Sequence, residues 1–466
     1  MIKVKKIERT DTSIPFNAAN RQLIPINLDL YNYVEEEYFY SGCANVYELK
    51  ENQVQIKNKN APYTNRFLLR KPKGRCNGKV VFEVLNSTNG WDVAPMWALL
   101  WKKIVQDGDV YVGMTSRSVS VRALKQYDAS RYESLSWKNP NSNPGKISKD
   151  ILMWQHSSLE DEDGLIWDIM NQLSTYLKTS LATKELGVEV NRIYATGCSQ
   201  SAMLLSTFMT RFDESTKESF IHSSFDGYLT YSGARELSLN QEQSPCPIEI
   251  VRNVRVPVMR FMSQWDFKDF AGDLRLRRED SDNINDRFRL YEVAGQAHNS
   301  YVGAFYRPGK EELARIGQET DLPKNNISPL PLEALICQGL RNLEVWKEKN
   351  IAPPCCQRIE VDNEGNELFD EYGNCKGGLR YPQLDVAYAT YYSGTKENAQ
   401  ESYYVPFSCE KLKNIYKTRK NYIHQIFEKM EEMVQQRWIS LSDLEHMEED
   451  ILKLDIFKED DADGYE

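Results

Sequence analysis

The sequence predicts an α/β fold with a mostly parallel central sheet that is flanked by helices. Runs of β-branched and aromatic residues alternate along the chain with helical patterns, and this alternation is typical of parallel sheets. Two of the runs, Lys79–Leu85 and Asn191–Thr196, are mostly apolar, as expected for strands that are covered on both faces. The other expected strands are Asp109–Thr115, Gly227–Tyr231, Val256–Met262 and Arg287–Val293.

The flanking helices are predicted from apolar residues that recur three and four positions apart. This spacing occurs in residues 162–182 and again in residues 200–212, so each segment is expected to bury one face. The two apolar stripes include Leu165, Ile169, Leu173, Leu177 and Leu181, and then Met203, Leu204 and Phe208.

We expect residues 1–420 to form a single domain that begins with a β-rich region. Residues 76–300 hold the predicted core strands, and residues 117–160 and 300–420 are expected to be insertions or covering segments. Residues 353–382 are dense in Gly, Asn, Asp and Pro, which predicts loops and hairpins.

Residues 421–466 are expected to form an acidic helical tail. Two helical patterns lie there, and Ser442 with Glu445 predicts a capping box before the second. A hairpin docked on the body is the expected arrangement, with protein contact or self-association through the tail as the alternative. The last residues, 458–466, are expected to fray.

The charge distribution argues against a nucleic-acid partner. The net charge is −10, and residues 421–466 alone hold fourteen acidic and four basic residues, so the rest of the chain is balanced. No run approaches the length of a membrane span, and no apolar secretory signal follows the first residues. We therefore expect a cytoplasmic protein if the N-terminus is the native one.

The cysteines predict free thiols in a reducing compartment. There are nine of them, an odd number, with no C-x-x-C pair. This pattern is unlike a zinc site or a disulfide scaffold.

Ser199 is the candidate nucleophile. It lies in Gly197-Cys198-Ser199-Gln200-Ser201, a tight join between a predicted strand and a predicted helix. This is the setting of a nucleophile elbow, although Ser201 stands where the usual G-x-S-x-G pattern has glycine. Cys198 is a rival nucleophile on chemical grounds, but that position of an elbow usually points into the core.

The order of the remaining candidates along the chain is serine, acid, histidine. His298 follows the last predicted strand in a loop of small residues, whereas His424 and His446 lie in the tail, and His156 and His222 are expected to be structural or surface residues. The candidate acid is Asp266, the first carboxylate after Val256–Met262, with Asp269 and Asp273 as alternatives.

Two backbone groups are candidates for an oxyanion hole. The N–H of Gln200 begins the helix after the nucleophile, at its positive end. The second donor is expected in the polar loop Asn86–Asp92, where Ser87 is the candidate. Aromatic residues of the 117–160 insertion, Tyr127, Tyr132, Trp137 and Trp154, are expected either to cover the site or to pack in the core.

Several stretches resemble the family of large, esterase-like alpha/beta hydrolase domain proteins. They include ATGCSQSA, FDGYL, RLYEVAGQAHNSY and GNCKGGLRYPQLDVAYATY, and the resemblance covers about residues 25–415. It implies an alpha/beta-hydrolase fold, with Ser199 as nucleophile and His298 as base. A T-E-T-D-like stretch of the family is similar to residues 263–266, where Asp266 is kept and Gln264 replaces a carboxylate. Many relatives look secreted.

The leading hypothesis is a serine hydrolase that cleaves a small carboxylic ester through Ser199, His298 and Asp266. This chemistry needs no metal or organic cofactor. Amide hydrolysis or acyl transfer with the same triad is one alternative. A non-catalytic alpha/beta-hydrolase relative that serves as a binding module is another.

Overall fold

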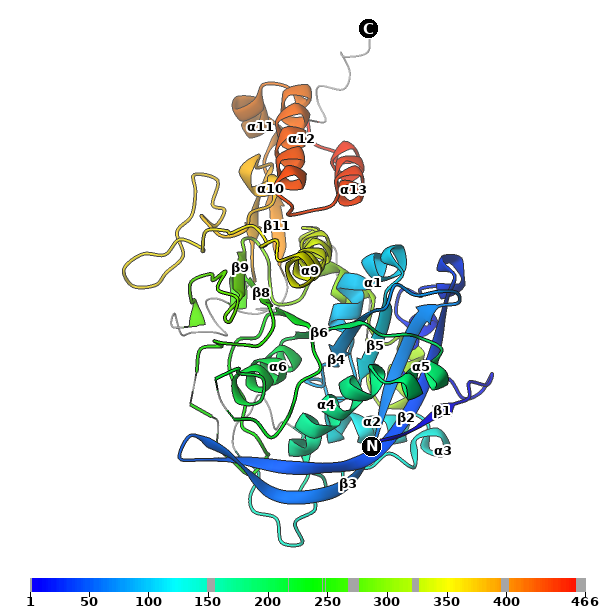
Figure 1. Cartoon of the computed structure of the whole chain (residues 1–466). Coiled ribbons are helices and arrows are strands. Elements are labelled where there is room, and N and C mark those ends of the chain that lie inside the picture. The colour runs from blue at the N-terminus through cyan, green and yellow to red at the C-terminus, as the bar shows by residue number, and fades with distance from the viewer. Residues whose placement is uncertain are drawn as a thin grey trace. The chain divides into compact units, whose positions relative to one another are not determined.

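The computed structural model contains two compact units (Figure 1). It describes residues 2–148, 156–216, 218–244, 246–247, 249–266, 276–320, 327–394 and 402–457. The first unit comprises Met1–Val258, Ser281–Phe288 and Phe305–Leu322. The second unit comprises Met259–Asp280, Arg289–Ala304 and Pro323–Glu466. The assignment of residues 1–420 to one domain stays a prediction.

The first unit is built on a sheet in which the strand order is β1-β2-β3-β5-β4-β6-β7. β4, β5, β6 and β7 are parallel, whereas β1, β2 and β3 are joined in antiparallel fashion. The predicted mostly parallel sheet with a β-rich N-terminal region is therefore confirmed. The strands are β1 (Lys3–Ile7), β2 (Tyr33–Lys50), β3 (Gln53–Pro72), β4 (Lys79–Val84), β5 (Val110–Met114), β6 (Arg192–Cys198) and β7 (Gly227–Tyr231).

The parallel strands are buried on both faces. Every residue of β5 and β7 is buried, and in β4 and β6 only the first residue is not. Continuous apolar runs suit this environment because neither face meets water. This is the physical reason that the predicted strands of this unit agree with the observed ones to within two residues.

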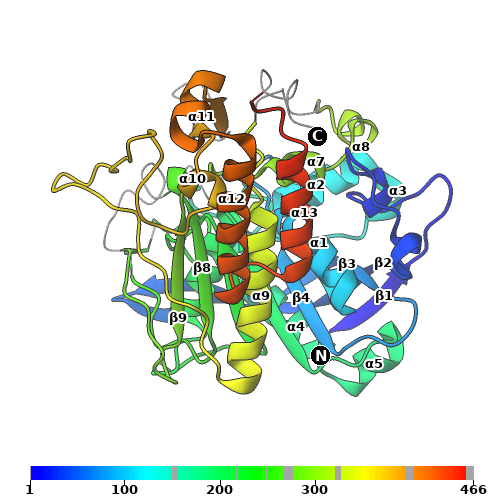
Figure 2. The ribbon, with the colours of Figure 1, turned by 90° about the horizontal axis from the view of Figure 1, so that it is seen from above.

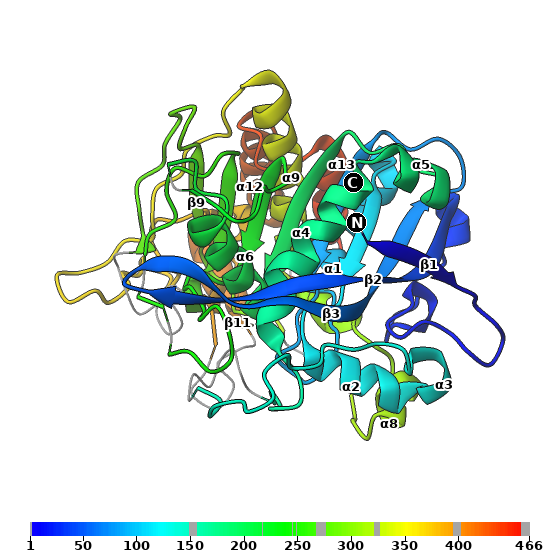
Figure 3. The same ribbon diagram turned by 60° about the horizontal axis from the view of Figure 1, so that its bottom comes forward.

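β2 and β3 form a long antiparallel ribbon that extends past β1 (Figure 3). Glu51 and Asn52 join them, and both residues have positive φ, 48° and 62°. Two such residues give the twist that a two-residue hairpin turn needs. The sequence analysis expected β-structure here without locating these strands.

Helices of the first unit are α1 (Pro95–Asp107), α2 (Ser118–Tyr127), α3 (Ala129–Tyr132), α4 (Ile166–Leu177), α5 (Ser180–Leu186), α6 (Gln200–Arg211) and α8 (Lys310–Arg315). The predicted helix over 162–182 is wrong in its extent. A short 3-10 turn, Asp163–Leu165, precedes α4, and the Thr179 side chain caps a separate helix, α5. Leu181 is consequently exposed rather than part of the buried stripe.

The second unit combines strands with C-terminal helices. β8 and β9 are adjacent and lie in this unit except for their first residues, and β10 and β11 form a separate antiparallel pair. The strands are β8 (Val258–Ser263), β9 (Phe288–Val293), β10 (Ala389–Tyr392) and β11 (Tyr403–Pro406). The helices are α7 (Tyr301–Phe305, most of which lies in this unit), α9 (Leu332–Lys349), α10 (Pro382–Asp385), α11 (Cys409–Tyr416), α12 (Arg419–Gln435) and α13 (Leu441–Leu452).

The tail helices pack within the second unit. α9, α12 and α13 lie side by side (Figure 2), and the Asn342 side chain of α9 donates to the Arg437 carbonyl just after α12 at 2.9 Å. The rings of Tyr291 and Trp438 meet edge to face with centroids 5.2 Å apart. Residues 458–466, expected to fray, lie outside the described residues.

The predicted capping box at Ser442 and Glu445 is wrong. Ser440 is the N-cap of α13: its hydroxyl accepts the Asp443 N–H at 3.2 Å, and the Asp443 carboxylate accepts the Ser440 N–H at 3.1 Å. The helix begins two residues earlier than predicted because this reciprocal pairing satisfies both donors.

Two features of the structure bear on the composition. All nine cysteines are free thiols. Across the part of the chain that the structure describes, no helix has the length and apolar character that crossing a bilayer would require.

Replacing Ser440 with Ala is expected to lower the free energy of unfolding by about 1 kcal/mol, because the N-cap loses its acceptor. Ser442→Ala is the matched control, and it is expected to change that free energy by less than about 0.5 kcal/mol. Urea unfolding of the two variants measures the difference. Equal effects would show that the capping box does not stabilise α13.

Candidate active site

The first unit has a topological switch point between β4 and β6. From β4 the chain passes to β5 on one side and later to β6 on the other, so the order is β5-β4-β6. Open parallel α/β sheets bind ligands beyond the carboxyl ends of the strands at such a point. Here those ends lead into the loop Asn86–Val93 and into the turn at Ser199.

Ser199 occupies a strained backbone conformation between β6 and α6. Its φ is 57° and its ψ is −121°, a combination that non-glycine residues rarely adopt. Its N–H donates to the Tyr231 carbonyl of β7 at 2.9 Å, and its side chain does not cap α6. Strand, strained serine and helix follow one another as a nucleophile elbow requires.

Small residues allow α6 to cross close to β6. A Cβ atom at Gly197 would lie 2.8 Å from the backbone C and O of Ser201. A Cβ atom at Gly233 would lie 2.4 Å from the carbonyl oxygen of Ser199. A larger residue at either position would therefore clash with the backbone of the turn.

Ser201, which stands where the usual pattern has glycine, stabilises the turn through its side chain. Its hydroxyl accepts the Cys198 N–H and donates to the Cys198 carbonyl, each at 2.9 Å. A glycine at this position would leave the polar groups of Cys198 without these bonds. Cys198 itself is buried, as expected for a packing residue.

The loop Asn86–Val93 is attached to the elbow. The Asn86 side-chain amide donates to the Cys198 carbonyl at 2.9 Å. The N–H groups of Asn86 and Thr88 are bonded within the loop, to the Val93 carbonyl and to the Asn86 side chain. Ser87 lies between them, and among the described residues no partner accepts from its N–H, so this N–H is one donor that is available.

Asp266 and His298 form a buried pair in the second unit. Asp266 follows β8, His298 follows β9, and Asp266 Oδ1 lies 2.6 Å from His298 Nδ1. The Asp266 carboxylate is fully buried and also accepts from the Ser263 hydroxyl. Gln264 accepts the Gly295 N–H at 2.7 Å, which ties the two loops together.

The environment of His298 changes its basicity. Burial acts to lower its pKa, but the charge of Asp266 and the hydrogen bond to it outweigh burial and raise the pKa above the usual 6.5. A histidine held in this way by a carboxylate has a fixed tautomer and a strengthened affinity for a proton.

The other candidates do not show such an arrangement. His156, His222, His424 and His446 are exposed. Asp269 and Asp273 lie outside the described residues.

The aromatic residues of the 117–160 insertion pack in the core where they are described. Tyr132 donates to Glu37, and the Trp137 indole donates to Asn65 at 3.3 Å, so these two do not cover a site. Tyr127 is buried. Trp154 lies outside the described residues.

Comparison with known proteins places the chain in a family. Three of the solved structures that it resembles are a serine hydrolase homologue from Coxiella burnetii (9% identity, 60% of this chain and 92% of that one, TM-score 0.29), esterase 2 from Thermogutta terrifontis (13%, 67% and 96%, 0.35) and esterase B from Lactobacillus rhamnosis (12%, 56% and 74%, 0.28). No curated protein matches the chain. Residues 3–449 match the family described as Alpha/beta hydrolase domain, a fold that supports a hydrolase function. The chain therefore belongs to the alpha/beta hydrolase domain family.

Proposed function

We propose that the protein is a serine hydrolase that cleaves a carboxylic ester of a small molecule. The observation that carries this proposal is the strained backbone of Ser199 at the strand-to-helix turn. Strain of this kind costs about 1–3 kcal/mol and is concentrated at functional sites. A purely structural turn has no need of it, since a glycine would adopt the same conformation without strain.

His298 is the proposed general base. Asp266 accepts the Nδ1 proton of the imidazole, which leaves Nε2 to take the proton of the Ser199 hydroxyl. The order of these residues along the chain is the one that alpha/beta hydrolases use. The raised pKa of His298 suits a group that must hold the proton of Ser199 while the acyl bond forms.

The proposed reaction proceeds through an acyl-enzyme. Ser199 Oγ attacks the ester carbonyl, and the N–H groups of Gln200 and Ser87 stabilise the oxyanion. The imidazolium of His298 then protonates the leaving alcohol, and a water molecule activated by the same imidazole hydrolyses the acyl-enzyme. An ester is the preferred substrate because an alcohol leaves more readily than an amine.

A fluorophosphonate probe is expected to label the wild-type protein and to leave Ser199→Ala unlabelled, because the probe reacts with an activated serine. Cys198→Ala is the matched control at the adjacent position and is expected to retain labelling. Mass spectrometry of the labelled peptide measures the outcome. Absence of labelling in folded wild type would refute the hydrolase proposal, and labelling that persists in Ser199→Ala would refute this nucleophile.

The change Asp266→Asn is expected to lower kcat by about 10⁴-fold, because an amide N–H that donates to Nδ1 in place of the carboxylate holds the imidazole in the wrong tautomer. It also removes both effects that raise the pKa of His298, so only burial remains and the pKa falls. Since the base must be neutral to act, the acid limb of the kcat/KM profile is expected to move to lower pH.

The pH dependence of kcat/KM measures this shift. Asp280→Asn makes the same change at another ion-paired aspartate of the second unit, 2.7 Å from Arg358, and is expected to leave the acid limb in place. An unchanged acid limb in Asp266→Asn would contradict the assignment of His298 as the titrating base.

A further inference from the structure

The loop that carries the Ser87 N–H has few contacts of its own to fix its shape. Asn86 and Val93 exchange two backbone hydrogen bonds at its base, each 2.9 Å long, and the Gly90 N–H donates to the Ser87 carbonyl. An oxyanion donor must lie within about 0.5 Å of its productive position. Besides the hydrogen bond from the Asn86 side chain to the Cys198 carbonyl, the loop therefore needs further support from outside.

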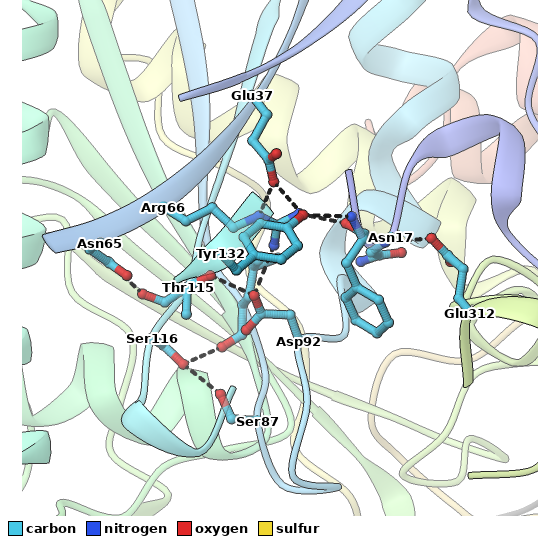
Figure 4. Close-up of polar contacts among 12 residues, drawn as sticks. Asn17, Glu37, Asn65, Arg66, Ser87, Asp92, Thr115, Ser116, Tyr132 and Glu312 are labelled. Atoms are coloured by element: carbon cyan, nitrogen blue, oxygen red, sulfur yellow. Dashed lines mark hydrogen bonds and ion pairs between the residues drawn. The ribbon is translucent and has the colours of Figure 1, made fainter. Parts of the chain in front are cut away.

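Two consecutive residues after β5 hold the loop near both of its ends (Figure 4). The Ser116 hydroxyl donates to the Leu85 carbonyl at 2.5 Å, so the Ser87 hydroxyl, 2.9 Å away, donates to Ser116. The Thr115 hydroxyl donates to the Asp92 carboxylate at 2.5 Å. Ser116 thus holds the Ser87 end, and Thr115 holds the Asp92 end.

A buried arginine completes the support. Arg66 of β3 donates to the same oxygen of Asp92 at 3.0 Å, and its Nε donates to Glu37 of β2. Both side chains of the Arg66–Asp92 pair are fully buried. Glu37 has a second buried cation, Arg131, within 2.6 Å, whereas Arg66 is the cation found beside Asp92 in the described residues.

Burying the two charges of the Arg66–Asp92 pair costs free energy, so stability alone does not explain the pair. Burial raises the pKa of the Asp92 carboxyl, and the charge of Arg66 opposes that rise without cancelling it. Replacing a buried ion pair by apolar residues is often neutral or stabilising. Its value here is the fixed position that it gives to the loop.

We propose that Asp92, held by Arg66 and Thr115, is a positioning residue that sets the Ser87 N–H where the oxyanion of the substrate forms. The inference rests on the proposed function, because an oxyanion arises only if Ser199 attacks a carbonyl. Asp92 does not touch the substrate and acts through the loop.

Replacing Asp92 with Asn keeps its shape and removes its charge. The kcat for a p-nitrophenyl ester is expected to fall by about 10²-fold, the effect of a displacement of about 1 Å at a reacting group. KM is expected to stay unchanged, because the oxyanion interaction is made in the transition state. The rate of fluorophosphonate labelling is expected to fall with kcat.

Glu35→Gln is the matched control. The Glu35 side chain is 5% exposed and lies 2.8 Å from Arg70 of β3 in the neighbouring ion pair. Glu35→Gln therefore makes the same acid-to-amide change away from the loop. It is expected to match Asp92→Asn in loss of thermal stability and to keep the wild-type kcat. Equal losses of kcat in the two variants, or an unchanged kcat in Asp92→Asn, would overturn the positioning role.

Thr115→Val provides a second variant, because it keeps the ion pair and removes one hydrogen bond to Asp92. It is expected to lower kcat less than Asp92→Asn does, again at constant KM, and it decides the question if Asp92→Asn does not fold. An unchanged kcat in Thr115→Val would then overturn the inference. Wild-type turnover that does not depend on Ser199 would overturn the proposed function itself, and the inference with it.

Discussion

The sharp turn at Ser199 is the constraint on which the rest of the first unit depends. A serine with φ of 57° is stable there only because contacts with the surrounding residues hold its backbone in this conformation. The Tyr231 carbonyl fixes its N–H, the Ser201 hydroxyl bonds both polar groups of Cys198, and two glycines let α6 approach. The same turn directs the first N–H groups of α6 toward the carboxyl edge of the sheet.

Buried charges fix the geometry around this edge. Buried ionised groups are costly unless they are paired, so each one specifies a partner and a position. In the first unit Arg66 meets Glu37 and Asp92, and Arg70 meets Glu35. Arg66 thereby links β2 and β3 to the loop after β4, and Arg70 joins β3 to β2.

The second unit holds its acid and its histidine by the same principle. Asp266 is fully buried and its carboxylate is bonded by both Ser263 and His298. The opposing effects of burial and of the carboxylate decide the pKa of the imidazole, and the carboxylate prevails. Gln264 anchors the loop of His298 by accepting the Gly295 N–H.

The sequence by itself determined the six strands from β4 to β9, the helix after Ser199 and the order of Ser199, Asp266 and His298. These features are local, because an apolar run or a helical stripe reports burial over a few neighbouring residues. Even so, local patterns misplaced the cap of α13, since Ser440 and Ser442 both suit an N-cap and packing selects one.

Only the tertiary structure decided which polar groups meet. It attached Asn86 to Cys198 and joined Arg66 to Asp92, and it brought the predicted acid Asp266 within 2.6 Å of His298. No periodicity marks such pairs, because a hydrogen bond between distant residues depends on how strands and loops pack rather than on local preference. The sequence alone therefore could not predict which residues support the Ser87 loop.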